Sequence, residues 1–289
     1  DVNVLARSRV RRWSGDRDIS NGKVQRAHFK PLLWTKFRHC MHLTPDVLFL
    51  THRSNFLTWA LAEKSSRGIP VALTVHGNEV YGHRDLERII HQMNQTDAVF
   101  AVSRYAEGRW RDLGIRPGIL HTIPHGVALD KFSSVGPSDS RNLPTGWDGL
   151  GDGPIILSAG RFRAVKGYDR MIRALPAVVG QIPGVRYVII GSGPEESRWK
   201  SLALDLGMEN RILWLPPVSY DRWGGSNHDC YNACDVFVGP SVRDPKTGDV
   251  EALGIATLEA SACERPVVVG RCGGAAFSRR SASGPDLAR

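Results

Sequence analysis

The 289-residue sequence lacks the features that mark membrane-spanning or disulfide-stabilised secreted proteins. No apolar run approaches the roughly 18 residues that a transmembrane helix needs. The first residues, DVNVLARSRVRR, do not form the basic-then-apolar leader of a secretory signal. The five cysteines are odd in number and include no C-x-x-C pair. The sequence therefore predicts a cytoplasmic protein with reduced thiols.

The sequence also offers little for a metal ion. His228, Cys230 and Cys234 form a loose H-x-C-x3-C pattern. A zinc site needs about four ligands, and no clear fourth ligand is present. Chance placement on one helix explains the pattern better, so we expect no metal site there.

Acidic residues are fewer than basic ones: 29 Asp and Glu stand against 38 Lys and Arg, which gives a net charge of +9. Such an excess predicts an anionic partner, and nucleic acid, acidic lipid and a phosphorylated substrate all qualify. Part of the excess lies in RSRVRR at residues 7–12, where a solvated basic edge is an equally good interpretation.

Short apolar runs alternate with amphipathic helical patterns through most of the chain. This alternation predicts βαβ units and parallel sheets covered on both faces, the α/β class. The strands are expected at residues 2–6, 46–51, 71–75, 98–102, 119–123, 154–157, 185–190, 211–215, 235–239 and 266–270. Helices are expected at residues 55–66, 83–94, 104–113 and 167–180.

A stretch rich in Gly, Ser, Pro and Asp, residues 133–153, separates the two halves and is typical of a linker. We therefore expect two Rossmann-like domains, residues 1–132 and 154–289, with a cleft between them. Ligands bind such sheets at the carboxyl ends of the strands, so both domains are expected to contribute to one site.

Two cations lie where a strand is expected to give way to a helix. Arg161 and Lys166 follow the strand PIIL in SAGRFRAVKGYDR. A helix N-terminus with a guanidinium and an ammonium suits a diphosphate, although the stretch does not match the G-x-x-x-x-G-K-[ST] phosphate loop. Two solvated cations beside a turn remain the alternative.

Two other loops at strand ends have a less specific chemistry. The stretch IIGSGPEE lacks the third glycine of a dinucleotide fingerprint, because Glu196 occupies that position. A tight turn that opens a helix is the better interpretation. His76 and Gly77 follow the strand VALTV, and a histidine there can bind a substrate or move a proton, or serve only the structure.

Two glutamates, Glu251 and Glu259, bracket the apolar stretch EALGIATLE. If the stretch is largely helical, they lie about 12 Å apart along the axis and are rotated by roughly 80°. Paired glycosidase carboxylates lie about 5–9.5 Å apart, so these two do not share one bond. They reach different parts of a long ligand, or one caps a helix and the other lies on the surface. Glu251 could also precede the helix on a loop.

Taken together, these segments resemble the retaining GT-B glycosyltransferases of family 4. The last matching segment has the family's E-x7-E signature, and its form, with H-G-x-E-V upstream, looks most like the mannosyltransferases that build phosphatidylinositol mannosides. The matching segments run through residues 45–275: VHGNEV, AVSRYAEGRWRDLG, IPHGVALDKF, SAGRFRAVKGYDRMIRAL, IIGSGPE, ACDVFVGPS and DVEALGIATLEASACERPVV.

The resemblance implies a role for each matching residue. Arg161 and Lys166 would bind the donor diphosphate and stabilise the leaving group. Glu251 would contact the donor sugar, and Glu259 would hold the ribose diol. His76 would reach the donor sugar from the N-terminal domain. Gly160 and Gly254 would complete the donor site.

The resemblance further implies transfer of a mannose- or glucose-type hexosyl group from GDP-mannose or a UDP-sugar to a lipid or saccharide acceptor, with retention of configuration. No metal or other cofactor is expected, because the cations replace it. The implied partners are the nucleotide-sugar donor and the acceptor. The net charge of +9 further suggests peripheral contact with an anionic membrane from the cytoplasmic side; nucleic acid is not expected.

The sequence departs from the family pattern in three places. Family members begin with a strand and a glycine-rich loop ahead of this chain's residue 1 and continue with a further βα unit and helices after the last matching segment, so both domains are expected to be incomplete. Ala252 stands where the signature has a glycine. The last residues, AAFSRRSASGPDLAR, do not resemble the family's continuation. A GT-B-related epimerase or phosphorylase, and a non-catalytic remnant, are therefore kept as alternatives.

Overall fold

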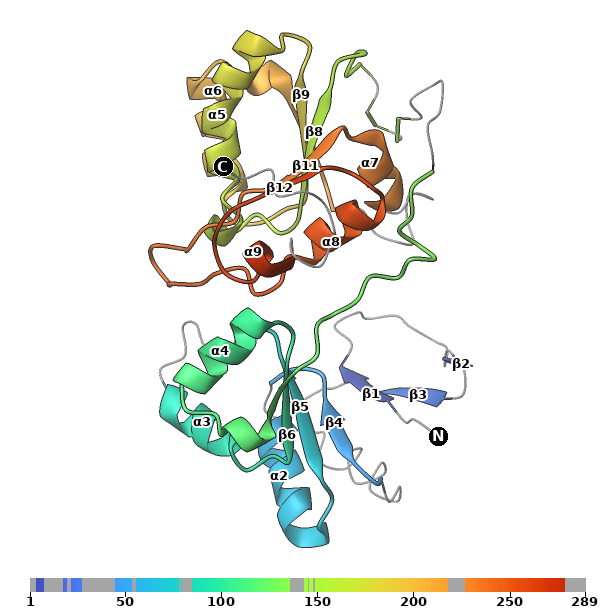
Figure 1. Ribbon diagram of the computed structural model, residues 1–289, viewed down its shortest axis with the longest axis vertical. Helices are drawn as coiled ribbons and strands as arrows, with labels where there is room; N and C mark the ends of the chain where they lie inside the picture. Colours follow the sequence, from blue (N-terminus) through green and yellow to red (C-terminus); the bar gives the residue numbers. More distant parts are fainter. Residues whose placement is uncertain are drawn as a thin grey trace. The chain divides into compact units, whose positions relative to one another are not determined.

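In a computed structural model the described residues are 4–7, 18–19, 22–27, 45–53, 56–77, 79, 85–135, 143–144, 146–147, 149–217 and 227–278 (Figure 1). The chain divides into two compact units, Asp1–Val47 and Leu48–Arg289. Most of the basic stretch 7–12 and the last residues, 279–289, lie outside the described part. The proposed domain boundaries at 132/133 and 153/154 stay a prediction.

The first unit contains a small mixed sheet with the order β1-β3-β2. Its strands are β1 (Val4–Arg7), β2 (Asp18–Ile19) and β3 (Gly22–Ala27). The pair β1 and β3 is parallel, and the pair β2 and β3 is antiparallel. The strand expected at residues 2–6 corresponds to β1, whereas β2 and β3 were not predicted.

The second unit begins with a four-stranded parallel sheet of order β4-β5-β6-β7. Each expected helix and strand of this region forms, with ends that shift by up to three residues. The elements are β4 (Leu48–Leu50), α2 (Phe56–Arg67), β5 (Val71–Val75), α3 (Leu86–Met93), β6 (Ala98–Ala101), α4 (Arg104–Asp112), η1 (Pro117–Ile119) and β7 (Leu120–Thr122).

Buried apolar side chains hold the three helices on this sheet. Leu73 of β5, Met93 of α3 and Trp110 of α4 are completely buried in one cluster. Helix α4 begins where it does because Ser103 is its N-cap and accepts a hydrogen bond from Ala106 N at 3.0 Å. This cap fixes the entry of the helix immediately after β6.

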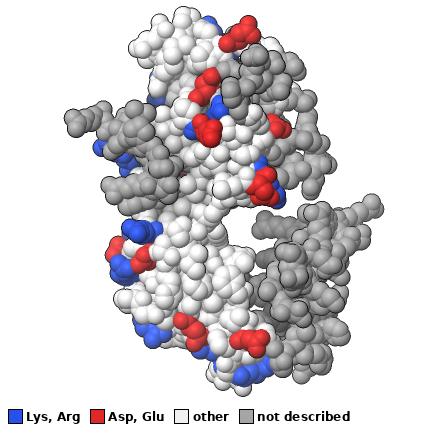
Figure 2. Space-filling model, turned by 45° about the vertical axis from the view of Figure 1, so that its right-hand side comes forward, with Lys and Arg blue, Asp and Glu red and all other residues white. Residues whose placement is uncertain are grey.

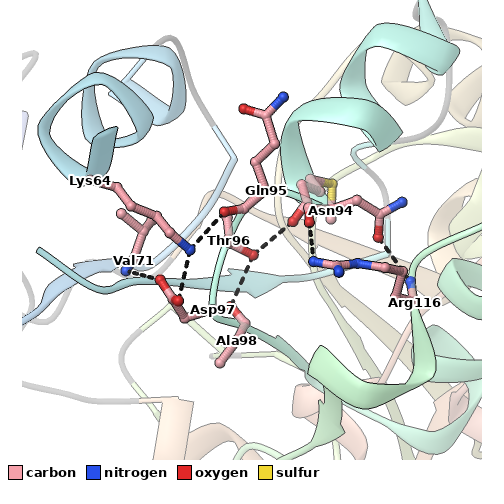
Figure 3. A network of polar contacts seen from close by, with 9 residues as sticks. Lys64, Val71, Asn94, Gln95, Thr96, Asp97, Ala98 and Arg116 are labelled. Atoms are coloured by element: carbon pink, nitrogen blue, oxygen red, sulfur yellow. Dashed lines mark hydrogen bonds and ion pairs between the residues drawn. The ribbon is translucent and has the colours of Figure 1, made fainter. Parts of the chain in front are cut away.

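A network of polar contacts closes the amino edge of this sheet (Figure 3). Asp97, which precedes β6, accepts hydrogen bonds from Val71 N at 2.8 Å and from Lys64 Nζ at 2.7 Å. Its own N–H donates to Val71 O at 2.8 Å. Arg116 N donates to Asn94 Oδ1 at 2.9 Å, which ties the end of α4 to the end of α3. The network gives partners to backbone groups at the ends of strands and helices.

The rest of the second unit builds a five-stranded parallel sheet of order β10-β9-β8-β11-β12. All expected strands and the helix at residues 167–180 form. The elements are β8 (Ile155–Ala159), η2 (Ala164–Lys166), α5 (Tyr168–Gln181), β9 (Arg186–Ile190), α6 (Glu196–Asp205), η3 (Glu209–Arg211), β10 (Ile212–Leu215), α7 (Asn227–Ala233), β11 (Val236–Gly239), α8 (Ile255–Ala262), β12 (Val267–Val269) and α9 (Ala275–Ser278).

Helices cover both faces of this sheet, with α5 and α6 on one side of β8 and β9 and α7 on the other (Figure 1). Alternate side chains of the strands enter two separate cores. Tyr187 and Ile189 of β9 pack with α5 and α6, whereas Val188 and Ile190 pack with α7 and α8. The continuous apolar runs therefore reflect burial on both faces, as the sequence predicted.

The surface of the described residues carries charges of both signs. On the face drawn in Figure 2, basic and acidic side chains lie interspersed in small groups among broad uncharged areas. Within the described part of the chain, no helix is long and apolar enough to cross a membrane.

Candidate active site

The candidate site lies at the carboxyl ends of β8 and β11, where the strand order reverses. From β8 the chain builds β9 and β10 on one side of the sheet, then returns to place β11 and β12 on the other. At such a switch point the loops run from the strand ends in opposite directions, which opens a crevice for a ligand. The loop after β8 carries Arg161 and Lys166, and the loop after β11 carries Glu251. The fold thus brings these three predicted residues to one edge.

The loop after β8 carries two cationic side chains, of which one is exposed and the other forms an ion pair. The guanidinium of Arg161 is exposed and makes no hydrogen bond or ion pair with any described residue. Lys166 ends η2, and its ammonium pairs with the carboxylate of Glu251. Gly160 begins the loop; a methyl group on its α-carbon would lie 3.3 Å from Lys166 Cε. Gly160 therefore gives the lysine chain room against the strand end.

The G-S-G stretch after β9 supports this loop rather than a dinucleotide. A methyl group on Gly191 would lie 1.9 Å from Gly160 O, so only glycine allows the two loops to touch. Phe162 N also donates to Ser192 O at 2.8 Å. The tight turn expected from the sequence is present, and α6 begins after it at Glu196. Its position against residues 160–162 was not foreseen.

Glu251 lies on a loop, and the helix of the E-x7-E stretch begins only at Ile255. Gly254 is the N-cap of this helix, with a left-handed backbone at φ 81°. The estimate for a continuous helix from Glu251 to Glu259 therefore does not apply, and the alternative of a loop position is confirmed. The N–H of Gly274 donates to Glu251 O at 2.7 Å and anchors the loop.

Glu259 lies one turn into α8, where a tyrosine orients it. The hydroxyl of Tyr231 in α7 donates to Glu259 Oε2 at 2.6 Å. Tyr231 is completely buried. Burial raises the pKa of its hydroxyl well above the usual value, and the nearby Glu259 carboxylate raises it further. Tyr231 is therefore a fixed neutral donor, and sequence reasoning did not identify it.

A second ion pair lies beside Lys166 and Glu251. Arg163 Nη2 is 3.0 Å from Asp249 Oδ2, and the Asp249 side chain is 3% exposed. Burial raises the pKa of the Asp249 carboxyl, and Glu251 and Asp244 raise it further, whereas Arg163 and the Val250 N–H act in the opposite direction. Asp249 Oδ1 has no hydrogen-bond partner among the described residues. Sequence reasoning missed this pair, although both residues lie inside the quoted motifs.

His76 follows β5, and its ring contacts two residues near the same sheet, Thr51 and His125. Its Nε2 lies 2.8 Å from Thr51 O and its Nδ1 lies 3.4 Å from His125 Nε2. A carbonyl oxygen only accepts, so His76 Nε2 carries the hydrogen of the bond to Thr51 O. Burial lowers the pKa of His125, and the nearby His76 lowers it further. His125 lies in the quoted IPHGV motif, but its pairing with His76 was not predicted.

The loops of His76 and Glu251 meet through their neighbours. A methyl group on Gly77 would lie 2.8 Å from the Ala252 Cβ, so the absence of a side chain at Gly77 accommodates the alanine that departs from the signature. Ser103 Oγ donates to Ala252 O at 2.6 Å. The start of α4 thus holds the Glu251 loop.

The H-x-C-x3-C pattern is used for packing. Cys230 and Cys234 are buried, and burial raises the pKa of each thiol to about 12. His228 Nε2 lies 3.1 Å from Ser133 O. In the part of the chain that the structure describes, no group of three or more His, Cys, Asp or Glu side chains could hold a metal ion.

Two family models together match most of the chain. The model for "Glycosyl transferases group 1" matches residues 148–277, and the model for "Glycosyltransferase Family 4" matches residues 4–131. The chain belongs to the glycosyltransferases of group 1 and family 4. The first model contains Arg161, Lys166 and the E-x7-E stretch, and the second contains His76.

Curated relatives of this glycosyltransferase include enzymes that act on inositol derivatives. A GDP-mannose-dependent alpha-(1-6)-phosphatidylinositol monomannoside mannosyltransferase of Mycolicibacterium smegmatis is 33% identical over 211 residues, which are 71% of this chain and 53% of the relative. A D-inositol 3-phosphate glycosyltransferase of Xylanimonas cellulosilytica is 35% identical over 62% of this chain and 42% of the relative. The chain thus spans about half the length of the curated relatives it matches.

Solved structures share the fold of this glycosyltransferase at low identity. HepE from Anabaena, in complex with UDP and glucose, has a TM-score of 0.69 at 19% identity and covers 88% of this chain and 69% of its own. Sucrose-phosphate synthase from Thermosynechococcus elongatus has a TM-score of 0.73 at 21% identity, over 95% of this chain and 72% of its own. The predicted α/β fold of the GT-B class is confirmed.

Proposed function

We propose that this chain moves a hexosyl group from a nucleoside diphosphate sugar to a lipid or saccharide acceptor, with retention of anomeric configuration. The observation that carries the proposal is the gathering of Arg161, Lys166 and Glu251 at the switch point between β8 and β11. Sequence membership in the family supports it independently.

The two cations of the β8 loop suit a diphosphate that leaves with its negative charge. Arg161 is free of protein partners in the described part of the chain and offers a planar set of donors for phosphate oxygens. Lys166 adds a second positive charge on the same loop. Fixed cations stabilise the charge that develops on the leaving diphosphate, which lowers the barrier to transfer. We propose that these cations act without a metal ion or other cofactor.

Donor binding exchanges one ion pair for contacts with two parts of the ligand. Before the donor arrives, Lys166 and Glu251 neutralise each other. In the bound state Lys166 turns to the diphosphate and Glu251 accepts hydrogen bonds from hydroxyls of the sugar. The pair is 24% and 19% exposed at its two side chains, so a ligand can reach both.

Glu259 suits the ribose of the nucleotide. A carboxylate accepts two hydrogen bonds from neighbouring hydroxyls, and Tyr231 fixes one of its oxygens at 2.6 Å. Gly254 ends the loop between the two glutamates and begins the helix that carries Glu259. The two carboxylates therefore serve different parts of one ligand, the sugar and the ribose.

The acceptor approaches from the loops of the sheet β4-β5-β6-β7, where His76 lies. We infer that His76 helps to place the donor sugar and that the acceptor hydroxyl attacks from the face that the diphosphate leaves. A lipid acceptor would bring the protein to the cytoplasmic face of an anionic membrane, which the net charge of +9 favours. Co-sedimentation with vesicles with and without anionic lipid tests this contact.

The ligands named for similar proteins suggest the order in which donors should be tested. GDP-mannose appears in the name of the Mycolicibacterium smegmatis relative, and UDP and glucose occupy the HepE structure. We therefore propose GDP-mannose as the first donor to test and UDP-glucose as the second, with phosphatidylinositol monomannoside as the first acceptor.

Two glutamate variants test the assignment. Glu259→Ala should mainly weaken binding of GDP or UDP, measured by isothermal titration calorimetry. Glu251→Ala should lower the rate of nucleoside diphosphate release by about 10²–10³ and leave nucleoside diphosphate affinity nearly unchanged. Glu87→Ala, which removes an exposed glutamate of α3, is the control and should change neither. Small and equal effects from both site variants would contradict the proposal.

A further inference from the structure

Two ion pairs join the same two loops of the donor site. Lys166 and Arg163 lie three residues apart on the loop after β8, and their partners Glu251 and Asp249 lie two residues apart on the loop after β11. The proposed function uses the first pair as ligand contacts. It leaves the second pair, Arg163 and Asp249, without a role.

The two pairs differ in how a ligand can reach them. The carboxylate of Glu251 is 19% exposed, whereas that of Asp249 is 3% exposed. A buried charge keeps its partner because the alternative is a charge without water or counter-ion. When the donor takes Lys166 and Glu251 apart, the Arg163–Asp249 pair therefore remains closed.

Asp249 is itself held rigidly by the turn that precedes it. Its carbonyl accepts from Asp244 N at 2.8 Å, and its N–H donates to Thr247 Oγ1 at 3.2 Å. The side chain of Asp244 accepts from Lys246 N at 2.9 Å and closes the turn. These bonds fix the backbone that carries the Asp249 side chain, so the carboxylate is an anchor for the arginine that reaches it.

We propose that Asp249 is a positioning residue: through Arg163 it holds the cation loop against the Glu251 loop while the donor replaces the Lys166–Glu251 pair. This inference rests on the proposed function, because it assumes that a nucleoside diphosphate sugar binds there. Arg163 has Arg161 two residues before it and Lys166 three residues after it, so a shift of Arg163 displaces both cations. Displacement of a charged group by about 1 Å costs about 100-fold in rate.

The titration of Asp249 supplies an independent signature. The groups that face its carboxyl are Arg163, Glu251 and Asp244, and its pKa is raised above the usual aspartate value. The ion pair exists only while Asp249 is ionised. It is therefore lost, as the pH falls, at a higher pH than an ordinary aspartate would require.

The test compares wild-type chain 1–289 with Asp249→Asn, Arg163→Gln and the double variant. The probes are GDP and UDP for affinity, and GDP-mannose and UDP-glucose for nucleoside diphosphate release. Each single variant should lower the release rate about 10- to 100-fold. The release rate of the double variant should be no lower than that of the slower single variant. Arg163→Lys, which keeps the charge, should recover part of the rate.

The control is Asp97→Asn, which weakens an aspartate–lysine ion pair and a backbone hydrogen bond at the amino edge of the other sheet. It should lower the melting temperature but leave affinity and release rate of the folded protein unchanged. In wild type, affinity should fall on acidification through the raised pKa of Asp249. This part of the pH profile should be missing in Asp249→Asn.

The outcomes separate the inference from the function on which it rests. If wild type binds neither GDP nor UDP, the proposed function fails and the inference fails with it. If wild type binds but Asp249→Asn and Arg163→Gln behave like Asp97→Asn in affinity, rate and pH profile, the positioning role is wrong and the function stands. If Asp249→Asn does not fold, Arg163→Lys answers the same question, because lysine keeps a positive partner for the buried Asp249 carboxylate.

Discussion

The aspartates that precede β6 and β11 make the same two hydrogen bonds, whereas the residues that follow β5 and β8 share no chemistry. Asp97 accepts from Val71 N and donates its own N–H to Val71 O, both at 2.8 Å. Asp235 accepts from Ile155 N at 2.6 Å and donates to Ile155 O at 2.9 Å. In each sheet these bonds join the first residue of one strand to the aspartate that immediately precedes the neighbouring strand.

The carboxyl edges of the two sheets carry different residues. After β5 the chain places His76 against His125 and Thr51, and after β8 it places two cations near the carboxylates of the β11 loop. The strand order differs too: among the described strands β4 to β7 follow one another in sequence, whereas β8 and β11 meet at a reversal. The amino edges thus serve stability, and the carboxyl edges carry the chemistry that distinguishes the two halves.

The largest effect on folding should come from the shared aspartates. Asp97→Ala and Asp235→Ala each leave a strand N–H without its partner, and each should lower the free energy of unfolding by about 1–3 kcal/mol. Nucleotide affinity of the folded protein should not change. Chemical denaturation and calorimetry check this, and a loss of affinity without loss of stability would break the division between edges.

The pH dependence sharpens the same prediction for Asp97. Burial raises the pKa of this carboxyl, but the hydrogen bonds from Lys64 and Val71 outweigh it and the net pKa is lowered. Its stabilising effect is therefore present above the ordinary aspartate pKa and is lost as the pH falls through the folded value. Wild type and Asp97→Ala should converge in stability under those acidic conditions.

A smaller effect is expected at the carboxyl edge from Tyr231→Phe. The variant removes the hydroxyl that holds Glu259 and leaves the ring in place. One hydrogen bond contributes about 0.5–1.5 kcal/mol, so affinity for GDP or UDP should fall about two- to tenfold with little change in the release rate. An unchanged dissociation constant would show that Glu259 needs no orientation by Tyr231.

The smallest effect should come from the histidine pair. The lowered pKa of His125 means that folding favours its neutral form, so its contribution is present above the ordinary histidine pKa and is lost as the pH falls through the folded value. His125→Asn should flatten the decrease in melting temperature between about pH 7.5 and 5.5. Identical pH profiles in both proteins would contradict the lowered pKa of His125.

Local patterns in the sequence predicted the second unit well. The run VALTV became β5, and the helix expected at residues 104–113 formed as α4. Arg161 and Lys166 were placed correctly at a strand end, because a strand followed by a helix fixes the edge on which its loop lies. The β2–β3 pair was missed because GKVQRA shows no clear apolar alternation.

The pairings within the site could not be read from local patterns. Arg163 and Asp249 belong to loops after β8 and β11, and Tyr231 and Glu259 belong to separate helices. Only the strand order brings these residues together. The start of α8 at Ile255 was left open between two alternatives, because apolar spacing alone does not show that Gly254 takes a left-handed backbone and begins the helix there.

Two lysines, one at each kind of edge, give the most direct test of the central claim. Lys166 pairs with Glu251 at the carboxyl edge of the five-stranded sheet, and Lys64 pairs with Asp97 at the amino edge of the four-stranded sheet. Titration calorimetry with GDP and UDP measures the nucleoside diphosphate affinity of wild type, Lys166→Ala and Lys64→Ala. Lys166→Ala should lose most of its nucleoside diphosphate affinity, while Lys64→Ala should keep it. Equal affinity in the two variants would contradict a donor site between β8 and β11.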